Sequence, residues 1–192
     1  ISILCKTTNA LGLVLAEDLS SPINMPPFRQ SAMDGYALNI HNGSSYTIID
    51  EVKAGDDHQP ILKAGDAVRI FTGSAVPNTA NTVVIQEKVT VDKNHLQLNN
   101  SVKIKENIRS KGEQIKDGDI ALKKGTKLTP AAIGFLLTLG IIKVPVFKKP
   151  KIGLVITGNE LIKAGQPLSY GKIYESNSGM LYTGLLGLGY TD

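Results

Sequence analysis

Short strand-like runs recur about every ten residues in the first half of this chain, and turn signals separate them. The runs are Ser45–Ile49, Ala67–Phe71, Thr82–Gln86, Lys88–Val91 and His95–Leu98. They combine β-branched and aromatic residues with alternating apolar and polar positions, a pattern typical of strands. The last two runs flank Asp92–Asn94, which predicts a hairpin with a three-residue loop. The spacing predicts a small β-barrel or sandwich, which we place at residues 24–108.

A helix and a short strand are predicted after this β unit. Thr129 and Pro130 suit the N-cap and the first turn of a helix, and apolar residues follow at helical spacing. Gly140 suits the C-terminal end of that helix. Lys143–Phe147 predicts an edge strand, because Pro145 cannot donate a hydrogen bond to a neighbour.

The last part of the chain predicts a second architecture. The continuous apolar run Ile152–Ile156 is typical of a strand buried on both faces of a parallel sheet, and a helix is predicted over 179–188. Together they form the first half of a doubly wound α/β unit, which about forty residues cannot complete. We therefore expect the missing strands beyond Asp192, and a mixed α and β, multidomain fold of which this chain is the N-terminal portion.

The amino-acid composition limits which partners the protein can bind and indicates the cellular compartment it suits. Hydrophobic residues make up 42% and charged residues 20%, as in a soluble folded protein. The net charge of +4 suits an anionic small molecule better than nucleic acid, because the lysines are scattered. Cys5 is the only cysteine and the histidines lie far apart, which predicts no cysteine or histidine metal site and suits a reducing, cytoplasmic compartment. The longest apolar run, Ile133–Ile142, is too short to span a bilayer.

Three turn segments carry oxygen-bearing side chains. They are Ser31–Gly35, Phe71–Gly73 and Thr157–Glu160. Asp34 and Glu160 can hold a divalent metal ion or position a water molecule. The third segment follows the predicted buried strand, where open α/β sheets bind ligands. Each segment alone also fits an ordinary turn with a solvated side chain.

A series of motifs in a fixed order resembles one family. The motifs are Pro26–Ala37, Arg69–Pro77, Val83–Glu87, Asn107–Glu113, Gly125–Pro130, Leu139–Ile141, Thr157–Leu161 and Ile173–Asn177. Together they are similar to the molybdopterin molybdenumtransferases, or molybdenum insertases, a family that includes the C-terminal domain of gephyrin. The resemblance extends over nearly the whole chain.

The resemblance implies a domain organisation and a reaction. Residues 1–23 and 109–147 would form a split elongated domain with the dimer contacts, 24–108 an inserted β domain, and 148–192 the truncated beginning of a molybdopterin-binding α/β domain. The enzyme would insert molybdenum from molybdate into adenylylated molybdopterin, release AMP and use Mg²⁺. It would act as a cytoplasmic homodimer that contacts the molybdopterin adenylyltransferase. The present chain alone is expected to be inactive.

The resemblance also implies site residues. Asp34, Thr72 and Glu160 match catalytic positions in a cleft between the β insert of one subunit and the α/β domain of the other. The implied substrate-binding residues are Ser31, Thr157, Gly158, Asn159, Ser176 and Asn177, and the implied metal ligands are Asp34 and Glu160. Asn159 departs from the family, which commonly has Asp there. The loss of that carboxylate leaves the number of metal ions open.

Two other functions would suit the same architecture. One is a non-enzymatic scaffold or anchoring protein like gephyrin, and the other is a basic β domain that binds nucleic acid. A scaffold needs none of Asp34, Thr72 and Glu160. Carboxylates in a cleft repel phosphate backbones, and aromatic residues, at 5%, are too few for base stacking. We therefore expect an enzyme, with neither membrane nor nucleic acid as partner.

Overall fold

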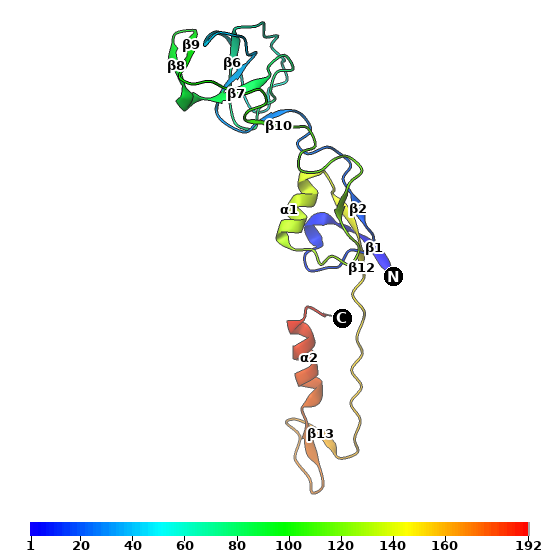
Figure 1. The fold of residues 1–192 in the computed structure, drawn as a ribbon. Helices are drawn as coiled ribbons and strands as arrows, with labels where there is room; N and C mark the ends of the chain where they lie inside the picture. Colours follow the sequence, from blue (N-terminus) through cyan, green and yellow to red (C-terminus); the bar gives the residue numbers. More distant parts are fainter. Residues whose placement is uncertain (192) are drawn as a thin grey trace.

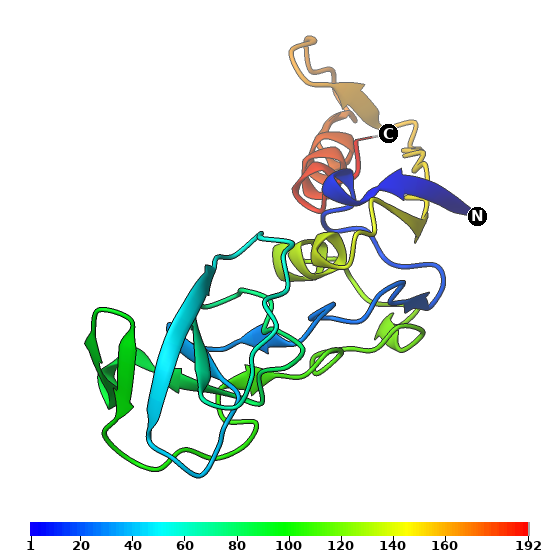
Figure 2. The ribbon, with the colours of Figure 1, turned by 90° about the horizontal axis from the view of Figure 1, so that it is seen from above.

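The computed structural model describes residues 1–191, which form three regions that follow one another in space (Figure 1). A six-stranded sheet lies at one end. The middle unit consists of β1 (Ser2–Lys6), the 3-10 helix η1 (Thr7–Asn9), β2 (Leu19–Ser20), β11 (Ile120–Leu122), α1 (Pro130–Thr138) and β12 (Lys143–Phe147). The C-terminal region consists of β13 (Leu161–Lys163), β14 (Ile173–Glu175) and α2 (Asn177–Gly187). A second view also shows α2 well away from the six-stranded sheet (Figure 2).

The six-stranded sheet has the order β7-β4-β6-β5-β9-β8. Its strands are β4 (Gly35–Leu38), β5 (Ser45–Val52), β6 (Asp66–Ile70), β7 (Thr82–Ile85), β8 (Val89–Asp92) and β9 (His95–Leu98), and the 3-10 helix η2 (Gln86–Lys88) joins β7 to β8. Neighbouring residues of one strand enter separate hydrophobic clusters. Val83 packs with Val68, whereas Val84 packs with Ala67. The sheet therefore buries side chains on both of its faces.

The predicted strands of this region are confirmed, but its closure and one loop differ from the prediction. Within residues 1–191, β7 and β8 are the two edges of a single sheet, so it is neither a closed barrel nor a two-sheet sandwich. Asp92 pairs with His95, which leaves a loop of Lys93 and Asn94 in place of the predicted three residues. Lys93 has a φ of 53°, a left-handed conformation that allows the tighter turn.

The middle unit joins distant parts of the chain. β1 pairs with β12, β2 pairs with β11, and β3 (Gln30–Ser31) pairs with β10 (Ile108–Arg109) where the chain enters and leaves the six-stranded sheet. Leu15, Leu128 and Leu136 are buried in its core. On the side of β12 away from β1, the Pro145 carbonyl accepts a hydrogen bond from the Ala16 N–H at 3.0 Å. Pro145 can return none, so pairing on this side stops at an isolated bridge.

Helix α1 follows its sequence signals closely. The Thr129 hydroxyl accepts a backbone hydrogen bond at the N-cap, at 3.2 Å. At the other end Gly140 has a φ of 77°, and the Ile141 N–H donates to the Leu136 carbonyl at 2.9 Å, as in a Schellman motif. Leu136 is fully buried, whereas Leu137 is 42% exposed. The apolar stripe of α1 is thus wider than the part of the helix surface that is buried in this chain.

The prediction of a strand at Ile152–Ile156 is wrong. These residues form an irregular, largely exposed segment, and up to residue 191 only the short parallel strand pair β13–β14 follows. An apolar run becomes a buried strand only when neighbouring strands and helices cover it, and residues 1–191 supply no such cover. Helix α2 is present and begins two residues before the predicted start at 179. No helix in residues 1–191 is long and apolar enough to cross a bilayer.

Candidate active site

The pairing of β4 with β6 brings Asp34 and Thr72 together. Gly35 lies opposite Ile70, so the residue just before β4 approaches the residues that follow β6. Asp34 Oδ1 accepts hydrogen bonds from the Thr72 N–H at 2.7 Å and from the Thr72 hydroxyl at 2.8 Å. Among the described residues no donor reaches Oδ2. That exposed oxygen is available to a proton, a cation or a substrate group.

The loop that carries Asp34 is held by buried groups behind it. Ser31 is fully buried, its hydroxyl donates to the Met33 carbonyl at 2.7 Å, and its carbonyl accepts from the Gly73 N–H at 2.9 Å. This hydroxyl, a predicted substrate contact, therefore supports the loop in this structure. A Cβ at Gly35 would lie 1.9 Å from the Val84 carbonyl oxygen, so only glycine fits there.

Hydrogen bonding fixes the charge of Asp34. The Thr72 N–H contributes most to holding the pKa of the Asp34 carboxyl below its ordinary value, and the Thr72 hydroxyl comes next. Slight desolvation opposes this effect, and the positive charge of Arg69 adds to it. Asp34 is therefore ionised at neutral pH. It can accept a proton or bind a cation, but it cannot donate a proton.

A pocket of about 260 Å³ opens beside this pair. Its lining residues are Met33, Asp34, Thr72, Ile85, Gln86 and Glu87. The Gln86 N–H donates to the Asp34 carbonyl at 3.2 Å, and the Gln86 amide donates to the Glu87 carboxylate at 3.2 Å. Neither Gln86 nor Glu87 was predicted from the sequence to have a role in the site. The signal that could have found them is their position directly after the buried strand β7, which pairs with β4.

The segment Thr157–Glu160 leads into β13 and is exposed throughout. The Glu160 carbonyl accepts from the Ile173 N–H at 2.9 Å, and the Lys172 ammonium donates to the Asn159 carbonyl. A Cβ at position 158 would lie 2.8 Å from Glu160 Oε1, which shows that the Glu160 carboxylate folds back over Gly158. These contacts fix the turn and leave the carboxylate accessible.

Ser176 and Asn177 lie at the opposite end of the β13–β14 pair from Glu160. Leu161 pairs with Ile173 at one end and Lys163 with Glu175 at the other. Three paired positions correspond to about 10 Å of strand. The structure therefore does not bring these two groups of predicted substrate contacts together.

Ser176 occupies the N-cap of α2 but makes no capping hydrogen bond with its side chain. Glu175 caps instead, because its carboxylate accepts from the Ser178 N–H at 2.7 Å and also from the Ser178 hydroxyl. The hydroxyl contributes most, and the N–H next, to lowering the pKa of Glu175. The Glu175 carboxylate therefore caps the N-terminal end of α2.

A single chain does not assemble the predicted metal site. Asp34 adjoins the six-stranded sheet, whereas Glu160 adjoins β13 at the other end of the molecule (Figure 1). No group of three or more His, Cys, Asp or Glu side chains that could hold a metal ion occurs in residues 1–191. In one copy of the chain the Asp34 and Glu160 carboxylates therefore lie far apart.

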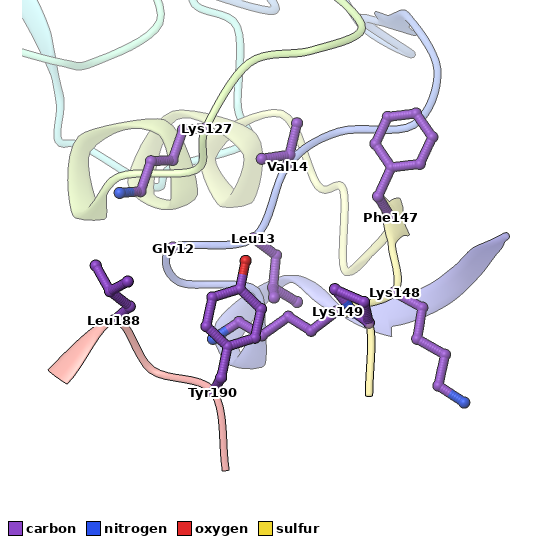
Figure 3. Close-up of a pocket in the computed structure, with 10 residues that line it drawn as sticks. Gly12, Leu13, Val14, Lys127, Phe147, Lys148, Lys149, Leu188 and Tyr190 are labelled. Carbon is purple, nitrogen blue, oxygen red and sulfur yellow. The ribbon is translucent and has the colours of Figure 1, made fainter. Parts of the chain in front are cut away.

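A different cavity, of about 360 Å³, lies where the end of α2 returns to the middle unit (Figure 3). Its lining includes Leu13, Lys127, Lys149 and Tyr190. The Lys149 ammonium donates to the Gly189 carbonyl at 2.7 Å and lies 5.8 Å from the centre of the Tyr190 ring. No predicted site residue reaches this cavity, and its contacts tie the C-terminal region to the middle unit.

Comparison with known proteins gives a consistent result. A family described as the MoeA N-terminal region (domain I and II) matches residues 1–140. The molybdopterin molybdenumtransferase of Haemophilus influenzae is 37% identical over 172 residues, which is 88% of this chain and 43% of that protein. The Bacillus subtilis protein of the same name is 33% identical over 195 aligned positions, and the match covers 95% of this chain and 45% of that protein.

A solved structure of similar fold is the molybdopterin biosynthesis moeA protein from Pyrococcus horikoshii OT3. It has a TM-score of 0.86 and 37% sequence identity, and the match covers 99% of this chain and 52% of that one. The chain thus spans about half the length of the solved structure and somewhat less than half of the curated relatives.

Proposed function

The chain belongs to the family of the MoeA N-terminal region, and from this premise we propose that it contributes residues to a molybdopterin molybdenumtransferase active site. In the proposed reaction, adenylylated molybdopterin and molybdate are the substrates, molybdenum is left on the dithiolene, and AMP is released. The names of the relatives support an enzyme of molybdenum cofactor biosynthesis. They do not favour the scaffold reading.

The observation that carries this proposal is the pair of hydrogen bonds from Thr72 to Asp34. They hold one carboxylate oxygen at 2.7 Å and 2.8 Å and leave the other exposed beside the 260 Å³ pocket. An ionised carboxylate fixed in this way can accept a proton from an attacking group or hold a cation next to a phosphate. On this basis we propose catalytic roles for Asp34 and Thr72. We propose Glu160 as the second catalytic carboxylate because it matches a family motif and stays exposed in the turn before β13.

We further propose that the site is shared between two copies of the longer enzyme of which this chain forms the N-terminal part. Asp34 and Glu160 lie at opposite ends of one molecule. A homodimer whose two copies run in opposite directions would place Asp34 of one copy beside Glu160 of the other, so that both carboxylates serve one substrate. Mg²⁺ fits such a site, because it is commonly held by one or two carboxylates together with water and substrate phosphates. When bound there it would neutralise phosphate charge.

The domain organisation and the setting are part of the same proposal. Residues 1–23 and 109–147 form the split elongated domain, 24–108 the inserted β domain, and 148–192 the beginning of the molybdopterin-binding domain. The pairing of β1 with β12 supports the first of these, because it joins the two parts of the split domain. The single cysteine suits the reducing cytoplasm. There the molybdopterin adenylyltransferase would hand over the adenylylated substrate by direct contact.

A chimera tests the proposal. Residues 1–192 are joined to the part of the Haemophilus influenzae relative that follows its matched region, and AMP release from adenylylated molybdopterin is measured with and without molybdate. We expect molybdate-dependent release from the chimera and from the Haemophilus protein, and none from residues 1–192 alone. A chimera that is folded by circular dichroism and dimeric, yet releases no AMP, would overturn the assignment.

A further inference from the structure

Arg69, three residues before Thr72 in the chain, lies between two aromatic rings. Its guanidinium carbon is 5.0 Å from the centre of the Tyr36 ring and 5.0 Å from the centre of the Phe71 ring. Tyr36 is the residue opposite Arg69 in the β4–β6 pair, and Phe71 is two positions further along the chain, on the same face. The planar guanidinium is therefore confined by the strands that carry the site.

The same guanidinium donates hydrogen bonds to two other segments. Nη1 donates to the Gly35 carbonyl at 3.3 Å, and Nη2 donates to the Gln86 side-chain oxygen at 2.7 Å. Gly35 follows Asp34, and the Gln86 N–H donates to the Asp34 carbonyl. Arg69 thus connects the beginning of β4, the end of β6 and the end of β7, which are the three segments that line the pocket.

No carboxylate in the described part of the chain forms a salt bridge with Arg69. Its cross-strand neighbour in β5 is Glu51, and Glu51 pairs with Lys53 at 3.0 Å. The donors of Arg69 are consequently directed to neutral oxygens on the site loops. An arginine whose only role was to neutralise charge would be expected to contact an acid instead.

We infer that Arg69 is a positioning residue, whose forked, stacked guanidinium fixes the end of β6 against β4 and β7 so that the Thr72 donors stay on Asp34. The effect of Arg69 on turnover rests on the proposed function, whereas its role in holding the loops around Asp34 and Thr72 does not. Lysine cannot take its place, because an ammonium is a point donor and lacks the planar fork that both spans two acceptors and stacks between two rings.

Hydrogen exchange tests the positioning in the 192-residue chain. In Arg69→Met we expect the Thr72 and Gln86 amides to exchange about tenfold faster, the size expected when a charged hydrogen-bond donor is lost. Arg69→Lys should give nearly the same increase. The Leu98 amide, which donates to the Ser44 carbonyl at 2.8 Å elsewhere in the sheet, should be unchanged.

Arg29→Met is the matched control, because Arg29 donates to the Pro77, Asn78 and Ala80 carbonyls in the same region of the fold. It should leave Thr72 exchange as in the parent. Unchanged Thr72 exchange in Arg69→Met, or full recovery in Arg69→Lys, would overturn the inference.

Turnover is measured separately in the chimera. We expect Arg69→Met and Arg69→Lys to lower kcat about tenfold with KM for adenylylated molybdopterin unchanged, as when a catalytic group is misplaced. An inactive parent chimera would count against the proposed function only, since the exchange result would still decide the positioning. Faster Thr72 exchange with full kcat would limit Arg69 to a structural role.

Discussion

A side chain at position 35 would collide with the backbone of the neighbouring strand, because an added Cβ would lie 1.9 Å from the Val84 carbonyl oxygen. Neither strand can move away without breaking the ladder that positions Asp34. We expect Gly35→Ala to lower the free energy of unfolding by about 3 kcal/mol, the upper part of the range for overpacking. Denaturant unfolding followed by circular dichroism measures it.

Gly134→Ala is the control for this prediction. Gly134 lies inside α1 with nothing within 4 Å of an added Cβ, so the substitution should stabilise the chain by up to about 1 kcal/mol. Equal effects at the two positions would show that the close approach at Gly35 is not decisive.

Asp34 is exposed, so its substitution should affect chemistry far more than folding. In the chimera we expect Asp34→Asn to lower AMP release about a hundredfold, as for the loss of a positioned base or cation ligand. The melting temperature should stay close to that of the parent. Asp92→Asn, on the β8–β9 hairpin of the same sheet, is the control and should keep full turnover. A large loss of stability with normal turnover would make Asp34 a structural turn residue.

At this scale the sequence identified Asp34 and Thr72 as candidates but not the reason they meet. That reason is the register of β4 against β6, a contact between segments far apart in the chain. The same limit explains why Arg69 and Gln86 were not recognised as supports of the loop. The partners of Arg69 and Gln86 can be identified only from the alignment of three strands. The turn that carries Asp34, by contrast, can be predicted from the residues next to it.

At the scale of elements, the first turn of α2 depends on an ionised Glu175. Its pKa lies below the ordinary 4.5 because Ser178 donates to the carboxylate. A lowered pKa contributes stability that is present above the unfolded value and is lost as pH falls through the folded value. We therefore expect α2 to begin fraying at its N-terminus only below about pH 4.5.

The Ser178 amide resonance, followed by NMR from pH 7 to pH 2.5, checks this expectation. In Glu175→Gln the amide oxygen still accepts a hydrogen bond, but its charge no longer titrates, so the shift with pH should disappear. A midpoint above pH 4.5 in the parent chain would contradict the lowered pKa.

Two elements show what sequence could and could not predict. Helix α1 was predicted with its caps because Thr129 and Gly140 act through contacts within a few residues. The run Ile152–Ile156 has an equally clear pattern, yet it is irregular in the structure. Strand formation there requires partners, and residues 1–191 provide none. Local signals are thus sufficient for helix ends but not for parallel strands.

At the scale of the whole molecule, the separation of Asp34 from Glu160 predicts self-association. We expect the chimera to be an elongated homodimer in light scattering over a concentration series, and its small-angle scattering profile to be that of an extended particle. Residues 1–192 alone should associate more weakly, because the C-terminal region is held to the middle unit by few contacts. A chimera that is monomeric and fully active would exclude a site shared between two copies.

The pairing of β1 with β12 also constrains how the chain can be made. The Thr7 hydroxyl donates to the Ile141 carbonyl, 134 positions further along the chain, so β1 has no partner until β12 has left the ribosome. The six-stranded sheet lies wholly between these positions and can fold first, although domains usually fold from the N-terminus. During that interval Ile3 and Leu4, which stay partly exposed even in the folded chain, carry an unpaired strand edge. We therefore expect a stage during synthesis at which the six-stranded sheet is folded while β1 is still unpaired and open to aggregation.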